Sequence, residues 1–148
     1  MSNLKQVTDF TQPLALNFSS DLGWWADMGQ DTNGLGWRVI TDPSSFFGLV
    51  TWVSMVPNGD ACSPAGTSRV YSVDVGTAES QLINTAGNTI AYSTAMPSVV
   101  IDQGTFSVNG VPRLLVGDDG GRTGILQRRT PSGMGLRRLN WRELPLAD

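Results

Sequence analysis

Apolar and polar positions between residues 36 and 75 alternate in a way that predicts three short β-strands joined by turns. Turn-forming residues occupy Asp42–Ser45 and Pro57–Asp60. The runs between them are rich in Val, Ile, Tyr, Trp and Thr, which fit the pleated surface of a sheet. These runs follow one another at hairpin distance and predict an antiparallel meander: Arg38–Thr41, Leu49–Val56 and Ser68–Val75.

The middle run is apolar on both of its faces. Successive side chains of a strand point to opposite sides of the sheet, so Leu49, Val53 and Met55 share one face. The other face carries Val50, Trp52 and Val56. A strand of this kind needs cover on both sides, which favours stacked sheets. We therefore expect four buried side chains in particular: Trp52, Val53, Tyr71 and Leu115.

Shorter strand signals occur on either side of this meander, and no segment shows sustained helical spacing. Residues 1–13 are weakly patterned and are expected to extend over the surface or fray. The pair Trp24–Trp25 is interpreted as core or blade-packing residues rather than as a ligand platform. The dipeptide Asn109–Gly110 is the strongest hairpin signal, since both residues tolerate positive φ. The remaining expected strands are Leu14–Phe18, Gly23–Met28, Thr89–Thr94, Pro97–Ile101, Phe106–Val108, Arg113–Val116, Gly124–Arg128 and Leu136–Leu144.

Together these signals predict an all-β fold of antiparallel meander sheets. With 148 residues, the chain has the length of one domain. One sheet is expected around residues 24–75 and a second around residues 98–144. Such sheets stack radially in β-propellers, which typically need about four to eight blades. We therefore predict a partial β-propeller of about two blades over residues 23–148, preceded by an extended N-terminal segment, residues 1–22.

Composition narrows the function classes. Charged residues are only 16% of the chain, and the net charge of −3 argues against a general nucleic-acid binder. No apolar run is long enough to predict a membrane span. Residues 1–22 lack the continuous apolar core of a secretory signal. The expectation is therefore either a cytoplasmic protein or the end of a longer exported chain.

Catalytic constellations are not evident in the sequence. The chain has no histidine, so Ser-His-Asp and Cys-His machinery is excluded. No Gly-rich phosphate loop leads into a helix. The two carboxylates at Asp118–Asp119 could ligate a hard cation, but a turn that caps backbone amides is favoured. We expect no enzyme activity, no cofactor and no metal.

Several segments carry a resemblance to a known family. The segments GWWADM, GWRVITDP, LVTWVSMVP, DACSPAGTSRVYSVDV and RRLNWREL lie between Gly23 and Leu144. In this order they resemble the C-terminal end of the type IV pilus tip-associated adhesins, the PilC/PilY group. In that family the region forms the last part of a β-propeller. The Cys-loop-strand order and the Arg-Arg-x-x-Trp-Arg ending are moderately specific together.

The resemblance implies a non-catalytic C-terminal portion of an adhesin that supports pilus biogenesis and surface attachment. The implied partners are pilus or minor pilin components, a host or abiotic surface, and the rest of a longer parent chain. The implied location is the cell surface, if the parent is exported. Family members often carry a calcium loop of alternating aspartates, and this chain has no such D-x-D-x-D spacing. A quinone-dependent dehydrogenase propeller is the enzymatic alternative, which an absorbance scan and metal analysis would detect.

Two sets of binding residues are candidates. The first lies on the loop Pro57–Thr67, because binding residues concentrate on loops of rigid scaffolds: Asn58, Asp60, Ser63 and Thr67. Cys62 in that loop is interpreted as a buried small hydrophobe, or as the partner of a cysteine elsewhere in a longer parent. The alternative is an anion-binding module built on the C-terminal arginines, although structural pairing with acids is favoured for them: Arg128, Arg129, Arg137 and Arg138.

Overall fold

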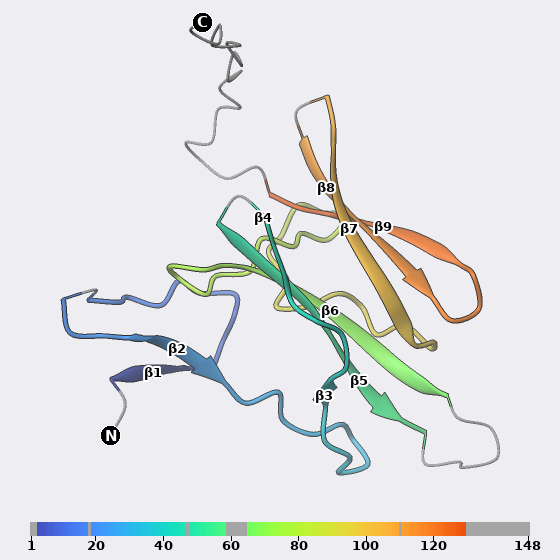
Figure 1. Cartoon of the computed structure of the whole chain (residues 1–148), viewed down its shortest axis with the longest axis horizontal. Helices are drawn as coiled ribbons and strands as arrows, with labels where there is room; N and C mark the ends of the chain where they lie inside the picture. The colour runs from blue at the N-terminus through green and yellow to red at the C-terminus, as the bar shows by residue number, and fades with distance from the viewer. Residues whose placement is uncertain (1–2, 18, 47, 59–64, 110, 130–148) are drawn as a thin grey trace, which may run out of the picture.

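The expected all-β fold class is confirmed by a computed structural model that describes residues 3–17, 19–46, 48–58, 65–109 and 111–129. Over these residues the chain forms strands and no helix, and so has no helix able to cross a membrane. Leu136–Leu144, an expected strand, lies outside the described residues. Figure 1 shows the strands β1 (Leu4–Val7), β2 (Gly23–Ala26), β3 (Arg38–Val39), β4 (Ser44–Phe46), β5 (Leu49–Pro57), β6 (Gly66–Asp74), β7 (Val100–Val108), β8 (Val111–Asp118) and β9 (Thr123–Gln127).

The predicted meander is the centre of the fold. Strands β5 and β6 form an antiparallel hairpin whose register runs from Leu49↔Asp74 to Pro57↔Gly66. Strands β3 and β4 both pair with the other edge of β5. Ser44 and Ser45 therefore belong to a strand rather than to the expected turn. Gly66 is required at the base of the hairpin, because a Cβ there would lie 2.7 Å from the Val56 carbonyl oxygen.

The outer edge of β6 is covered by the irregular segment between residues 79 and 96. Ser68 and Met96 exchange two backbone hydrogen bonds of 2.9 Å, and the Ser93 amide donates to the Val70 carbonyl. The Ser93 hydroxyl accepts the Val70 amide at 3.0 Å. The expected strand Thr89–Thr94 is wrong, since this segment makes only isolated bridges. The segment protects a sheet edge that would otherwise present unpaired amides and carbonyls.

A second antiparallel sheet has the order β7-β8-β9. The predicted hairpin at residues 109–110 is confirmed, because Val108 pairs with Val111 and Asn109 has a φ of 51°. The two strands expected between residues 97 and 108 are instead one continuous strand, β7. Its irregularity lies between Val100 and Asp102, where the register shifts. Gly104 lies within β7, and the chain does not turn there.

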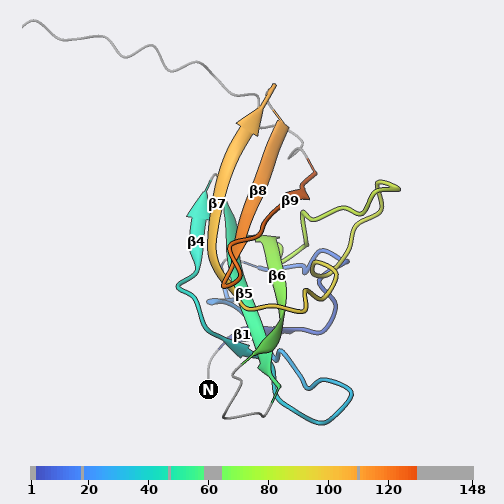
Figure 2. The ribbon, with the colours of Figure 1, turned by 90° about the vertical axis from the view of Figure 1, so that its right-hand side faces the viewer.

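The two sheets pack face to face, as neighbouring blades of a partial propeller do (Figure 2). Val53 and Val70 of the central sheet are buried against Leu114 and Val116 of β8. The expected burial of Leu115 is wrong, since its side chain is 40% exposed. Leu115 alternates with its two neighbours, so it points away from the interface. The second sheet therefore covers one face of β5 and β6.

The N-terminal part of the chain covers the opposite face. Strand β1 pairs in parallel with β2, and Val7 and Phe10 are buried against Trp52 and Tyr71. The expectation that residues 1–13 extend over the surface is therefore wrong for Val7 and Phe10. Leu14 to Asn17 are not a strand either, and Phe18 lies outside the described residues.

The paired tryptophans take different positions on β2. Trp24 packs against the aromatic cluster, and its Nε1 donates to the Val75 carbonyl at 2.8 Å. Trp25 is 45% exposed. The core interpretation is confirmed for Trp24 and wrong for Trp25, since alternation along the strand directs the two rings to opposite sides.

Acid is expected to loosen the turn between β8 and β9, where Asp118 caps the backbone as predicted. Its Oδ1 accepts the amides of Arg122 at 2.7 Å and of Gly120 at 3.0 Å. Hydrogen bonds from the Arg122 amide first, then from the Ser98 side chain and the Gly120 amide, hold the pKa of Asp118 below its usual value. The folded carboxylate thus binds its proton less tightly than the unfolded one. Its stabilising contribution is present above the unfolded pKa of about 3.9 and is lost as the pH falls through the lowered value.

The measurement is the hydrogen-exchange protection of the Gly120 and Arg122 amides at about pH 5 and about pH 2.5. Protection should fall at the lower pH in the wild type. The variant Asp118→Asn, whose side-chain oxygen accepts hydrogen bonds without titrating, should show no such fall. Equal protection of the wild type at both pH values would contradict the proposed role of the carboxylate.

Candidate functional site

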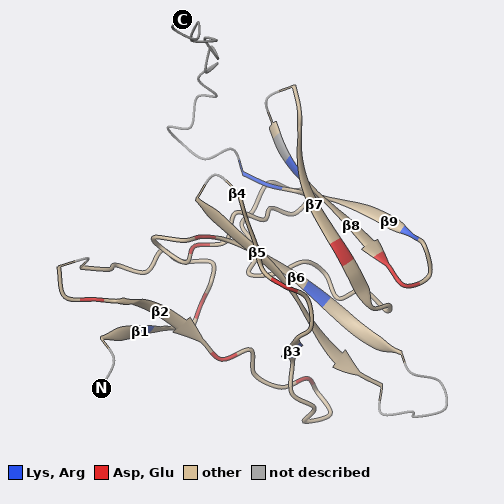
Figure 3. Ribbon diagram, in the orientation of Figure 1, with Lys and Arg blue, Asp and Glu red and all other residues tan. Residues whose placement is uncertain are grey.

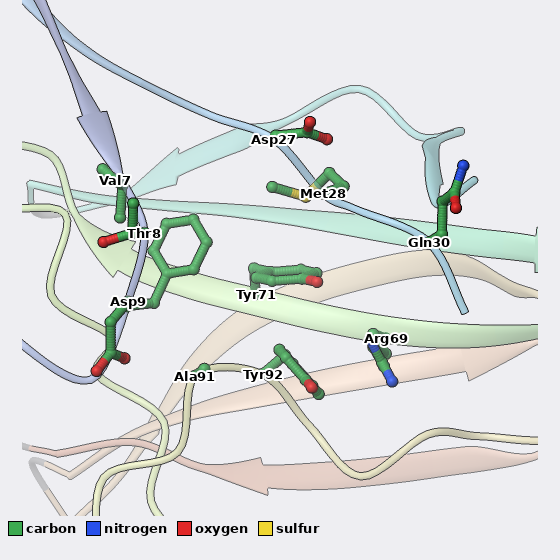
Figure 4. A pocket seen from close by; sticks show the side chains of 11 residues that line it. Val7, Thr8, Asp9, Asp27, Met28, Gln30, Arg69, Tyr71, Ala91 and Tyr92 are labelled. Atoms are coloured by element: carbon green, nitrogen blue, oxygen red, sulfur yellow. The ribbon is translucent and has the colours of Figure 1, made fainter. Parts of the chain in front are cut away.

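A cleft of about 290 Å³ lies over one face of β6 (Figure 4). Its floor is β6, one wall is the connection that follows β2, and the other wall comes from residues 91–92. Residues 7–10, at the end of β1 and just beyond it, close one end. The principal lining side chains are Asp9, Phe10, Asp27, Arg69, Tyr71 and Tyr92.

Arg69 is held between two aromatic rings. Its guanidinium carbon lies 3.9 Å from the ring centroid of Trp37 and 4.2 Å from that of Tyr92. Cation–π contacts of this kind attract the charge to both ring faces and fix the plane of the guanidinium. Its Nε is buried and has no hydrogen-bond partner among the described residues. The stack therefore presents a positioned cation at the cleft.

Tyr71 comes from the same face of β6, because it lies two residues beyond Arg69 in the strand. Its ring stacks on Trp52 with centroids 4.9 Å apart and planes 3° from parallel. Phe10 meets Tyr71 edge-on at 5.7 Å. Burial raises the pKa of the Tyr71 hydroxyl. The hydroxyl therefore keeps its proton at neutral pH.

Two carboxylates stand at the rim of the cleft, on different connections (Figure 4). The Asp27 Oδ1 accepts the Gly29 amide at 2.9 Å, and the Asp9 Oδ1 accepts the Thr11 amide at 2.8 Å. Hydrogen bonding by the Thr11 amide and hydroxyl holds the pKa of Asp9 below its usual value. Each carboxylate is thus held in a tight turn by one oxygen. Figure 3 shows a basic segment in blue on β6 and an acidic segment in red just beyond β2.

The arrangement brings together hydrogen-bond donors, acceptors and apolar ring surface. Arg69 supplies donors, while Asp9, Asp27 and Gln30 supply acceptors. Phe10 and Tyr92 supply aromatic surface. No group of three or more His, Cys, Asp or Glu side chains placed to hold a metal ion occurs in the described part of the chain. This combination of groups can bind a small polar organic ligand.

Of the four predicted binding residues on the loop Pro57–Thr67, the structure describes Asn58 and Thr67. Asn58 closes the base of the β5–β6 loop, where its amide donates to the Ala65 carbonyl at 2.9 Å and its Oδ1 accepts the Ala65 amide at 3.4 Å. Thr67 is half-buried in β6 opposite Val56. Asp60, Cys62 and Ser63 lie outside the described residues. The binding role of Asn58 and Thr67 stays a prediction.

Of the four C-terminal arginines, the structure describes Arg128 and Arg129, and of these two only Arg129 is exposed. Arg128 is only 2% exposed and lies between the two sheets, so the alternative in which it meets an anionic surface does not hold for this residue. Its Nη2 donates to the Thr51 hydroxyl at 2.6 Å and its Nη1 to the Thr105 hydroxyl at 3.0 Å. Arg129 is exposed and pairs with Glu79 at 3.1 Å, which is the favoured structural role. Arg137 and Arg138 lie outside the described residues.

The sequence interpretation missed the cleft. Its residues come from four separate segments, and no single segment carries a motif. One local signal was available, because Arg69 places a charge on the same strand face as Tyr71. A charged side chain on the same strand face as the buried Tyr71 and Val73 marks a site that is not simple core.

Comparison of the chain with family models, with curated proteins and with solved structures finds no match.

Proposed function

We propose that this chain is the non-catalytic C-terminal portion of a type IV pilus tip-associated adhesin, supporting pilus biogenesis and surface attachment. The observation that carries the proposal is the placement of the family-like segments. GWRVITDP spans β3 and leads to β4, LVTWVSMVP is β5, and the end of DACSPAGTSRVYSVDV is β6. These segments are therefore consecutive strands of one sheet, as parts of a single propeller blade would be.

The outward face of the second sheet supports a longer parent chain as a partner. Its exposed apolar side chains include Val108, Leu115 and Ile125, and Leu115 and Ile125 are direct neighbours across β8 and β9. Exposed apolar patches mark surfaces that bind another element. In a propeller that element is the next sheet of the ring. The remaining partners in the proposal are pilus or minor pilin components and a host or abiotic surface, with the protein at the cell surface.

The test compares two substitutions and a deletion in the native host. Val53 is fully buried between the sheets, so Val53→Asp should abolish the fold of this portion and with it piliation and attachment. Leu22 is 78% exposed, so Leu22→Asp is the matched control and should leave both intact. Pili are counted by electron microscopy and attached cells by plate assay. Unchanged piliation and attachment after deletion from Gly23 onward would refute the proposed function.

A further inference from the structure

We propose that the cleft over β6 binds a single neutral sugar unit of a carbohydrate. At about 290 Å³ it lies at the small end of ligand pockets, which matches one sugar ring rather than a peptide or an extended cofactor. The inference deepens the proposed attachment role, because it names the class of ligand. It is tested by binding in solution, so its failure leaves the piliation experiment unaffected.

The charges around the cleft oppose ligands with a net charge. Arg69 lies on the floor, so a cationic ligand would meet a fixed positive charge. Asp9 and Asp27 stand on different connections at the rim, so an anionic ligand would meet two carboxylates. Neither a positive nor a negative ligand is therefore favoured in every part of the cleft. A neutral ligand with many hydroxyl groups avoids both penalties.

The same groups match the hydrogen-bonding capacity of a sugar. A hydroxyl both donates and accepts, so one sugar ring can donate to carboxylate oxygens and accept from a guanidinium. Hydrogen bonds to charged groups are stronger than those between neutral groups. Asp27 and Asp9 each have one oxygen engaged by a backbone amide, and Oδ2 of each accepts no hydrogen bond from the described residues. These oxygens and the Arg69 edge are therefore available to hydroxyl groups.

The aromatic side chains of the cleft match the apolar face of a sugar ring. A sugar ring has an apolar face of C–H groups, and burying that face against an aromatic ring is favourable. Tyr92 is the lining aromatic ring that reaches the surface, since Phe10 and Tyr71 are buried. Its ring is already oriented by Arg69 on one side. Tyr92 is therefore the expected stacking residue, with Arg69 and Asp27 as the hydrogen-bonding residues.

The experiment is saturation-transfer difference NMR on the full chain, which reads the ligand signals and detects weak binding. The probes are the methyl glycosides of glucose, galactose, mannose and N-acetylglucosamine. Counter-probes of similar size are glycine for a zwitterion, acetate for an anion and tetramethylammonium for a cation. We expect saturation of at least one glycoside, with a Kd of order 1 mM, and none of the three counter-probes.

Three variants locate the binding. Tyr92→Ala should weaken the glycoside about 2- to 10-fold, the range expected for one aromatic contact. Tyr92→Phe keeps the ring and should bind as the wild type does. Trp25→Ala removes an exposed aromatic ring outside the cleft and should also leave binding unchanged. Far-UV circular dichroism of each variant verifies that the fold is retained.

Asp27→Asn separates a sugar from a charged ligand. In the variant the side-chain oxygen still accepts the Gly29 amide, and an NH2 group replaces Oδ2. A sugar hydroxyl can accept from that NH2 group instead of donating to a carboxylate, so glycoside binding should fall only modestly, whereas a ligand held by an ammonium group would be lost. Three results would overturn the proposal: no glycoside receives saturation, the signal survives Tyr92→Ala at full strength, or a counter-probe binds more tightly than every glycoside.

Discussion

Replacing Trp52 with alanine is expected to lower the free energy of unfolding by about 3–5 kcal/mol, the range for truncating a buried Phe or Trp side chain. Trp52 is 7% exposed and stacks on Tyr71. It also meets Phe10 at 5.9 Å and Trp24 at 6.4 Å. Truncation removes all three ring contacts and leaves a cavity under the N-terminal layer. Because total stabilities are about 5–15 kcal/mol, the variant should be largely unfolded in mild urea.

The matched control is Trp25→Ala, which removes the same side chain from an exposed position on β2. Its cost should stay within about 0.5–1 kcal/mol. Urea unfolding followed by far-UV circular dichroism measures both variants without relying on tryptophan fluorescence. An equal loss in the free energy of unfolding for the two variants would show that the aromatic cluster around Trp52 does not dominate the stability of the fold.

Replacing Arg128 with alanine is expected to cost about 2–4 kcal/mol, because it leaves a cavity and removes the partners of two hydroxyl groups. Arg128 is the largest fully buried side chain among the described residues. Its two hydrogen bonds go to the hydroxyls of Thr51 and Thr105, and no described carboxylate pairs with it. Burial lowers the pKa of Arg128 to about 10, since the charged form is desolvated.

The contrasting variant is Arg128→Met, which fills the space without a charge. Arg128→Met fills the cavity and removes the desolvated charge but still leaves the Thr51 and Thr105 hydroxyls without this partner, so it should cost clearly less than Arg128→Ala. Arg129→Ala removes the exposed pair with Glu79 and should change stability by less than about 1 kcal/mol. If Arg128→Met were as damaging as Arg128→Ala, the hydrogen bonds to Thr51 and Thr105, rather than packing, would hold the sheets together.

Features that depend only on a few neighbouring residues could be predicted from the sequence. The Asn109–Gly110 turn follows from the tolerance of those residues for positive φ, and Asn109 has a φ of 51°. The Asp118 turn follows from the reach of a short carboxylate to amides two and four residues ahead. Strands β5 and β6 follow from their composition and the turn residues between them. Each of these signals is local, so it does not depend on the rest of the fold.

Features that depend on which elements meet could not be predicted. Alternation along β8 separates Leu115 from Leu114, but it does not say which of the two faces β5. Likewise, the Gly104 region has turn-forming residues, yet β7 continues through it because β8 pairs with every residue from Asp102 to Val108. Val7 and Phe10 sit in a weakly patterned segment and become core only because the Trp52 face needs cover. Tertiary pairing overrides local preference in each case.

The sequence by itself determined that this chain is all-β, where its central hairpin lies, and that β5 needs cover on both faces. These follow from side-chain periodicity and turn chemistry, which act over neighbouring residues. Only the tertiary structure decided what supplies that cover and where a ligand can bind. Phe10, Arg69 and Tyr92 are far apart in the chain and share one cleft because β6 packs between the N-terminal layer and the 79–96 segment. A site assembled from distant segments has no local pattern, since its geometry arises only when the layers pack.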